Sequence, residues 1–180
     1  TVLTEMWEND NKIHVSPDGT KILYYRTGNT EAANNINAVT IDGKTFKAIV
    51  KDGYNMGVLW APDSQQFLFG KKDVITGRTG LWLGNVVTGA VKNLDLATSP
   101  DKAVWTADGT TIVVAVPKQP TGVAGSGQDM FYKVSASSLI KESFDPKVSV
   151  DARELFLSLE NDRVYFRNML NGGLYYLNLK

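Results

Sequence analysis

Four carboxylates at regular spacing are the residues whose pattern first suggests chemistry. Asp18, Asp63 and Asp108 are 45 residues apart, and Glu160 follows 52 residues after Asp108. A regular set of carboxylates could form calcium sites or acid–base sites. Each of these carboxylates, however, lies in a short turn, where an acidic side chain accepts hydrogen bonds from the local backbone. We therefore predict that they cap turns and bind no metal. Asp145, Asp151 and Glu154 are interpreted in turn as a solvated connection before the last repeat.

Nucleophilic and redox chemistry find little support in the sequence. His14 is the single histidine, and the chain has no cysteine. A thiol nucleophile or a multi-histidine metal centre therefore cannot be assembled. A serine hydrolase triad would need His14 itself, and the sequence has no G-x-S-x-G motif. We predict that His14 packs in an inner strand, that the chain is not an enzyme and that it holds no metal or cofactor.

The glycine-rich segment 122–127 resembles a phosphate-binding loop only in composition. It lacks the Lys-Ser/Thr pair of such loops, and residues 128–131 lead into a strand. No helix N-terminus is then available to hold an anion. We interpret this segment as a flexible loop.

The carboxylates mark an internal repeat. Residues 13–25 return as 58–69 and again as 103–114, and a degenerate copy spans 155–166. Every copy has an apolar run, a turn rich in Pro, Asp, Asn or Gly, and a second apolar run, which is the pattern of a β-hairpin. Two further strand-like runs follow the first three hairpins, and one follows the last.

Four strands in each 45-residue repeat are typical of a propeller blade. The fold predicted is all-β, an antiparallel β-propeller with about four four-stranded blades in one domain or domain fragment. The blades span residues 13–50, 58–96, 103–144 and 155–180, and 1–7 is a candidate ring-closing strand. Three assemblies stay open: a closed small ring, half of a larger ring shared by two chains, and the C-terminal part of a longer propeller. The last is preferred.

The repeat resembles that of TolB-type propellers, which also occurs in the propeller domains of prolyl-oligopeptidase and tricorn-type peptidases. Ser16-Pro17-Asp18-Gly19 carries the resemblance, and it is echoed by residues 60–63 and 105–109. The fourth copy departs from the pattern because it lacks Pro and Gly. This resemblance implies a propeller fold, and no single functional residue is transferred by it.

Recognition is expected on one face of the propeller, which we call the long-loop face. There the second strand of each blade joins the third, and the segments 26–34, 71–80, 117–129 and 167–173 are long, whereas the hairpin turns opposite are short. Long loops on a rigid scaffold are frequent recognition sites. The residues predicted to bind are Arg26, Asn29, Lys71, Arg78, Lys118, Gln119, Gln128, Arg167 and Asn168, with Tyr54 and Asn55 on an adjoining loop.

The composition limits the kinds of partner that we expect for this chain. The 19 basic and 19 acidic residues give no net charge, so no basic excess favours nucleic acid. Apolar runs are too short to span a membrane. We expect a non-catalytic propeller that binds a protein or peptide or serves as a scaffold. The alternatives are the gating propeller of a serine peptidase and a propeller that binds a small ligand or sugar. A homodimer and missing N-terminal blades are both compatible with the sequence. A cysteine-free chain that resembles a periplasmic family suggests an extracytoplasmic location, periplasmic or secreted.

Overall fold

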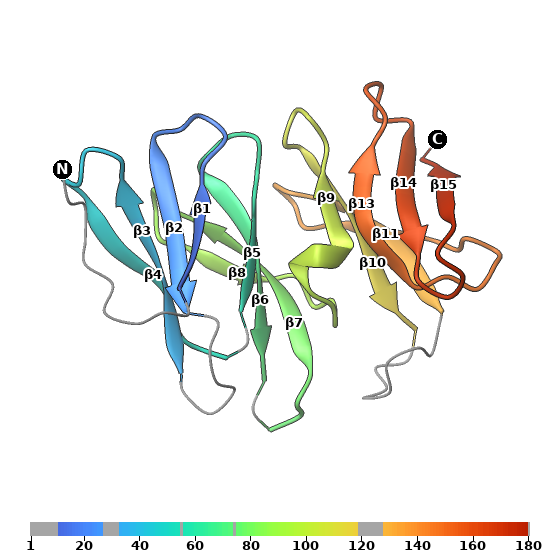
Figure 1. The fold of residues 1–180 in the computed structure, drawn as a ribbon, viewed down its shortest axis with the longest axis horizontal. Helices are drawn as coiled ribbons and strands as arrows, with labels where there is room; N and C mark the ends of the chain where they lie inside the picture. The colour runs from blue at the N-terminus through green and yellow to red at the C-terminus, as the bar shows by residue number, and fades with distance from the viewer. Residues whose placement is uncertain (1–10, 27–32, 55, 74, 119–127, 180) are drawn as a thin grey trace. The chain divides into compact units, whose positions relative to one another are not determined.

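The computed structural model describes residues 11–26, 33–54, 56–73, 75–118 and 128–179. Within these ranges the chain forms strands and one 3-10 turn, and all strand pairs are antiparallel (Figure 1). The chain divides into two compact units, Thr1–Asp95 and Leu96–Lys180. Each unit contains two sheets.

The first unit contains two four-stranded sheets whose strands follow one another in sequence order. Sheet 1 consists of β1 (Asn11–Val15), β2 (Lys21–Arg26), β3 (Asn34–Thr40) and β4 (Phe46–Gly53). Sheet 2 consists of β5 (Gly57–Trp60), β6 (Gln66–Lys72), β7 (Thr79–Asn85) and β8 (Val91–Asn93).

The second unit repeats this order with a shorter last sheet. The 3-10 turn η1 (Pro100–Lys102) leads into sheet 3, which consists of β9 (Ala103–Trp105), β10 (Thr111–Pro117), β11 (Asp129–Ser135) and β12 (Lys141–Phe144). Sheet 4 has three strands among the described residues, β13 (Ala152–Leu157), β14 (Arg163–Asn168) and β15 (Leu174–Asn178). The all-β architecture of about four antiparallel blades is therefore confirmed. The candidate closing strand 1–7 lies outside the described residues.

The turn chemistry predicted for the repeated carboxylates is present in the first three hairpins. Asp18 Oδ1 accepts the Thr20 amide at 2.9 Å, and Asp108 Oδ1 accepts the Thr110 amide at 3.0 Å. Asp63 accepts the amides of Gln65 and Gln66. These bonds close the turn between the first and second strands, so the motif is structural.

The fourth hairpin corrects the prediction for Glu160. Ser158 Oγ donates to Asp162 at 2.6 Å and accepts the amides of Asp162 and Arg163. Among the described residues Glu160 caps no amide of this turn, and Asp162 takes the place of the turn aspartate as the acceptor of the Ser158 hydroxyl.

Each unit has its own apolar core between its two sheets. In the first unit, Leu23 and Ile36 of sheet 1 pack with Phe67 and Phe69 of sheet 2. The ring of Phe67 fills the space above Gly84, where a Cβ atom would lie 2.5 Å from its Cζ. In the second unit, Val113, Ala115 and Phe131 of sheet 3 pack with Val164 and Phe166 of sheet 4. Burial of both sheet faces explains the nearly continuous apolar runs of the inner strands.

His14 has a packing role in β1, as predicted. Its ring stacks on Tyr25 at a centroid distance of 5.6 Å. Burial, together with the nearby Lys12 ammonium, lowers the pKa of His14 below its ordinary value. The imidazole is therefore neutral near pH 7 and serves as a flat packing surface.

Candidate binding site

The connections at the two ends of a sheet differ most in length in sheet 3, 118–128 against 106–110, whereas in sheet 4 the connections 169–173 and 158–162 are equally long, so the predicted contrast is absent there. At one end the chain turns through 16–20, 61–65, 106–110 and 158–162, each of which is short. At the other end, which in each unit is the long-loop face, it runs through 27–33, 73–78, 118–128 and 169–173, and it leaves for the next sheet through 54–56, 94–102 and 145–151. The candidate site is the long-loop face, described for each unit separately.

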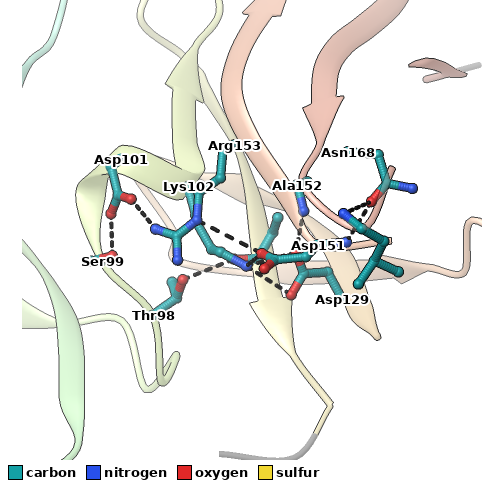
Figure 2. Close-up of polar contacts among 11 residues, drawn as sticks. Thr98, Ser99, Asp101, Lys102, Asp129, Asp151, Ala152, Arg153 and Asn168 are labelled. Atoms are coloured by element: carbon teal, nitrogen blue, oxygen red, sulfur yellow. Dashed lines mark hydrogen bonds and ion pairs between the residues drawn. The ribbon is translucent and has the colours of Figure 1, made fainter. Parts of the chain in front are cut away.

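A buried ion cluster organises the long-loop face of the second unit (Figure 2). Lys102 Nζ lies 3.0 and 2.8 Å from the two carboxylate oxygens of Asp129 and 2.7 Å from Asp151 Oδ1. The Lys102 and Asp129 side chains are 5% and 3% exposed, and that of Asp151 is 21% exposed. A buried ammonium needs such partners because an uncompensated charge is costly away from water.

Local structure explains why Lys102 points inward. Pro100 occupies the first turn of η1, where its missing amide hydrogen leaves no bond unmade, and the Lys102 amide donates to Ser99 O at 3.1 Å. This tight turn ends directly before β9 and places Lys102 beside the first residue of β11, Asp129.

The cluster also ties the connection 145–151 to both sheets of the unit. Asp129 Oδ2 accepts the Ala152 amide at 2.7 Å, and the Asp129 amide donates to Val150 O at 2.8 Å. On the other side, Asn168 Oδ1 accepts the Asp151 amide at 3.1 Å (Figure 2). The connection is therefore held in place by side chains from β11 and β14.

A second layer of ion pairs lies around this cluster, nearer to solvent. Arg153 pairs with Asp101, and its Nε lies 3.7 Å from Asp151 Oδ1. Lys118 Nζ lies 3.1 Å from Asp145 Oδ2. The arrangement holds charges in fixed places but offers no activated nucleophile, because the one buried amine carries two carboxylate partners.

In the first unit, the predicted residues lie along the ends of β2, β4 and β6. Lys71 Nζ donates to Lys51 O at 3.4 Å, and the Lys72 amide donates to Tyr54 O at 3.0 Å. Arg78 precedes β7, and its carbonyl accepts the Asp73 amide. Arg26 is the last residue of β2. No ion pair joins Lys71 or Arg78 to a carboxylate of the described residues.

In the second unit, the predicted residues have different environments. The Lys118 amide donates to Gln128 O, so these two residues form the neck of the loop between β10 and β11. Arg167 lies 3.8 Å from Glu154, and both side chains are at least half exposed. Asn168 is 2% exposed and lies beneath the surface, where it bonds to its own loop and the neighbouring one. The predicted residues Asn29, Asn55 and Gln119, and the segment 122–127, lie outside the described residues.

Sequence reasoning missed the Lys102 cluster. The interpretation of Asp151 as part of a solvated connection is wrong, because its carboxylate is bound to Lys102. The repeat gave no signal, since the position 45 residues before Lys102 is Gly57. A lysine directly before a buried strand was the available clue, because a cation at such a place requires a partner.

Among the described residues, no group of three or more acidic or histidine side chains is arranged to hold a metal ion. No helix in this part of the chain has the length and apolar character needed to cross a bilayer.

Successive antiparallel sheets of strands in sequence order, each followed by a connection to the next sheet, define the β-propeller repeat fold. The chain matches no protein-family model. It also matches no curated protein.

Solved structures do match, and they show that the fold is of the TolB propeller type. TolB from Acinetobacter baumannii is 17% identical with a TM-score of 0.60, over 92% of this chain and 42% of that one. The β-propeller domain of the Trilobed protease from Pyrococcus furiosus is 18% identical with a TM-score of 0.66, over 94% and 54%. A prolyl endopeptidase is 14% identical with a TM-score of 0.64, over 96% and 28%. The chain thus spans about half or less of each of these three chains.

Proposed function

We propose that this chain is a non-catalytic propeller segment that binds a protein or peptide, or serves as a scaffold, through its long-loop face. The observation that carries the proposal is the Lys102 cluster, which holds η1, the first residue of β11 and the connection 145–151 in one arrangement. A preorganised loop surface binds with a smaller loss of conformational entropy than a mobile one.

The first unit supplies charges suited to an acidic partner. Lys71 and Arg78 lack carboxylate partners among the described residues, whereas Lys118 and Arg167 of the second unit are paired with acids. A cation without a partner gains more from a new carboxylate than one that must first break an ion pair. We infer that the acidic part of a bound peptide contacts Lys71 and Arg78.

Peptide selection tests this proposal. Peptides selected from a random phage-display library against the chain are measured by titration calorimetry. Lys71→Ala with Arg78→Ala should weaken binding at least tenfold, because a charge-assisted hydrogen bond contributes about 1.5–3 kcal/mol. Lys44→Ala is the matched control, since Lys44 is an exposed cation in the turn between β3 and β4 at the opposite end. Equal weakening by the control, or failure to select any peptide, contradicts the proposal.

A second candidate is the gating propeller of a serine peptidase. Two of the three structures compared above come from peptidases, a Trilobed protease and a prolyl endopeptidase. The open reading frame that encodes this chain distinguishes the gating role from the binding role. A hydrolase domain with a G-x-S-x-G motif on the same polypeptide supports the gating role, and a frame without one supports the binding role.

We also propose an extracytoplasmic location, periplasmic or secreted. Support comes from the absence of cysteine and from the resemblance to TolB-type propellers. Fractionation of the source cells with an antibody against the chain checks this, and a purely cytoplasmic signal contradicts it.

A further inference from the structure

Residues that pair across a sheet form rows, and one row recurs at the same place in all four sheets. In sheets 1 to 3 this row includes the residue five positions after the turn aspartate, which is Leu23, Leu68 or Val113. In sheet 4 the residue five positions after Glu160 is Tyr165. The rows are His14–Leu23–Ala38–Lys47, Leu59–Leu68–Leu83–Lys92, Val104–Val113–Lys133–Glu142 and Phe156–Tyr165–Tyr176.

In sheets 1 and 3 this row faces the sheet that follows in the same unit. Leu23 and Ala38 belong to the core that sheet 1 shares with sheet 2. Val113, with Val104 against it, belongs to the core that sheet 3 shares with sheet 4. Leu23 and Val113 are fully buried. The row is therefore the surface on which a following sheet packs.

In sheet 4 the same row is aromatic and largely uncovered. The rings of Phe156 and Tyr165 stack at 5.2 Å, and those of Tyr165 and Tyr176 lie 5.9 Å apart. Arg163 lies over the Tyr176 ring at 5.4 Å. Phe156 is 49% exposed and Tyr176 56% exposed. We call Phe156, Tyr165 and Tyr176 the aromatic row.

Sheet 1 presents the other side of such a contact, the surface that in sheets 2 and 4 packs on the preceding sheet. Its row Val15–Ile22–Val39–Phe46 is equivalent to Trp60–Phe67–Gly84–Val91 of sheet 2 and to Leu157–Val164–Leu177 of sheet 4. Phe67 and Val164 pack on the preceding sheet of their own unit. In sheet 1 the end members of this row are exposed, Val15 at 55% and Phe46 at 58%, whereas Ile22 is half-buried and Val39 is 4% exposed. We call Val15, Ile22, Val39 and Phe46 the aliphatic row, after its first three members.

We propose that the aromatic row of one copy of this chain packs on the aliphatic row of a second copy. The contact reproduces the packing of sheet 1 on sheet 2 and of sheet 3 on sheet 4. Each copy has one row of each kind, so a two-fold dimer with two equivalent contacts covers all four rows. Water exposure of several large apolar side chains in a patch is typical of such an interface.

Light scattering coupled to size-exclusion chromatography tests the proposal on the unmodified chain. A mass of about twice 19.7 kDa that persists through a dilution series is expected. Phe156→Asp with Tyr176→Asp should reduce the mass to that of a monomer. Ile140→Asp should not, since Ile140 is 71% exposed but lies in the turn between β11 and β12. The proposal is overturned if the unmodified chain is a monomer, or if the variant with Phe156→Asp and Tyr176→Asp is still a dimer.

Mixing two variants tests which rows pair. Val15→Asp with Phe46→Asp should also give a monomer. A mixture with the sheet 4 variant should form dimers again, because one intact aromatic row then meets one intact aliphatic row. A sheet 1 variant that remains dimeric by itself, or a mixture that stays monomeric, overturns the pairing. Near-UV circular dichroism confirms that each variant is folded before its mass is interpreted.

Discussion

Lys102 Nζ lies 2.8 Å from Asp129 Oδ2, although 27 residues separate the two in sequence. The same ammonium lies 2.7 Å from Asp151 Oδ1, so one cation joins the turn before β9, the first residue of β11 and the connection before β13 (Figure 2). Both Lys102 and Asp129 are nearly inaccessible to water. The stability of the second unit and the placement of its loops therefore depend on the same contact.

Replacing Lys102 should destabilise the chain strongly. In Lys102→Met the carboxylate of Asp129 stays buried without its cation, and the expected loss in the free energy of unfolding is about 3–5 kcal/mol. Urea unfolding followed by circular dichroism measures it. Lys118→Met is the matched control, because the Lys118–Asp145 pair is about one third exposed and should contribute at most about 1 kcal/mol. Similar losses in both variants would show that the buried Lys102 cluster contributes no more to the free energy of unfolding than an exposed ion pair.

Asn168 should behave as a structural residue and not as a contact residue. Its side chain accepts the amides of Asp151 and Leu170 and donates to Ser149 O. Asn168→Ala leaves these groups without partners, and a loss of about 2 kcal/mol is expected in thermal or urea unfolding. Asn171→Ala is the control, because the Asn171 side chain is exposed and donates to Tyr175 Oη at 2.7 Å. This change should reduce the free energy of unfolding by less. The idea fails if Asn171→Ala is the more damaging change.

Gly84 should not tolerate a side chain. A Cβ atom there would lie 2.5 Å from Cζ of the fully buried Phe67. Gly84→Ala should therefore cost about 1–3 kcal/mol through overpacking of the first unit. Gly80→Ala in the same strand is the control, since its nearest contact would be 3.3 Å, to Trp82 Nε1. Unfolding midpoints in urea compare the two, and equal midpoints would contradict the expected clash.

Acid should destabilise the hairpin turns. The Thr106 hydroxyl, followed by the Thr110 amide and hydroxyl, holds the pKa of Asp108 below its ordinary value. The unfolded chain, in which the pKa of an aspartate is about 3.9, then binds more protons. Stability is thus fully present above that pKa and is lost as pH falls through the folded pKa. Asp108→Asn should show a smaller drop in the urea midpoint between pH 7 and pH 3.5 than the unmodified chain. An identical drop in both would rule out a contribution from this turn.

Repeats, strands and turns were predictable because their signals are local. The Pro-Asp-Gly turn after residue 16 specifies its own hydrogen bonds, and alternating apolar runs on either side specify a strand pair. The regular return of this pattern was sufficient to predict a propeller repeat. Glu160 was the exception, since Asp162 and not Glu160 accepts the hydroxyl of the turn serine, Ser158.

Only the tertiary structure showed which charges meet and which rows stay uncovered. Lys102 lies in η1, Asp129 in β11 and Asp151 in the connection before β13, and no periodicity relates them. The aromatic row differs from its equivalents in sheets 1 and 3 in residue type and in exposure, because no following sheet among the described residues packs on it. Turn and strand preferences depend on neighbours in sequence, whereas burial and ion pairing depend on which distant segments the fold brings together.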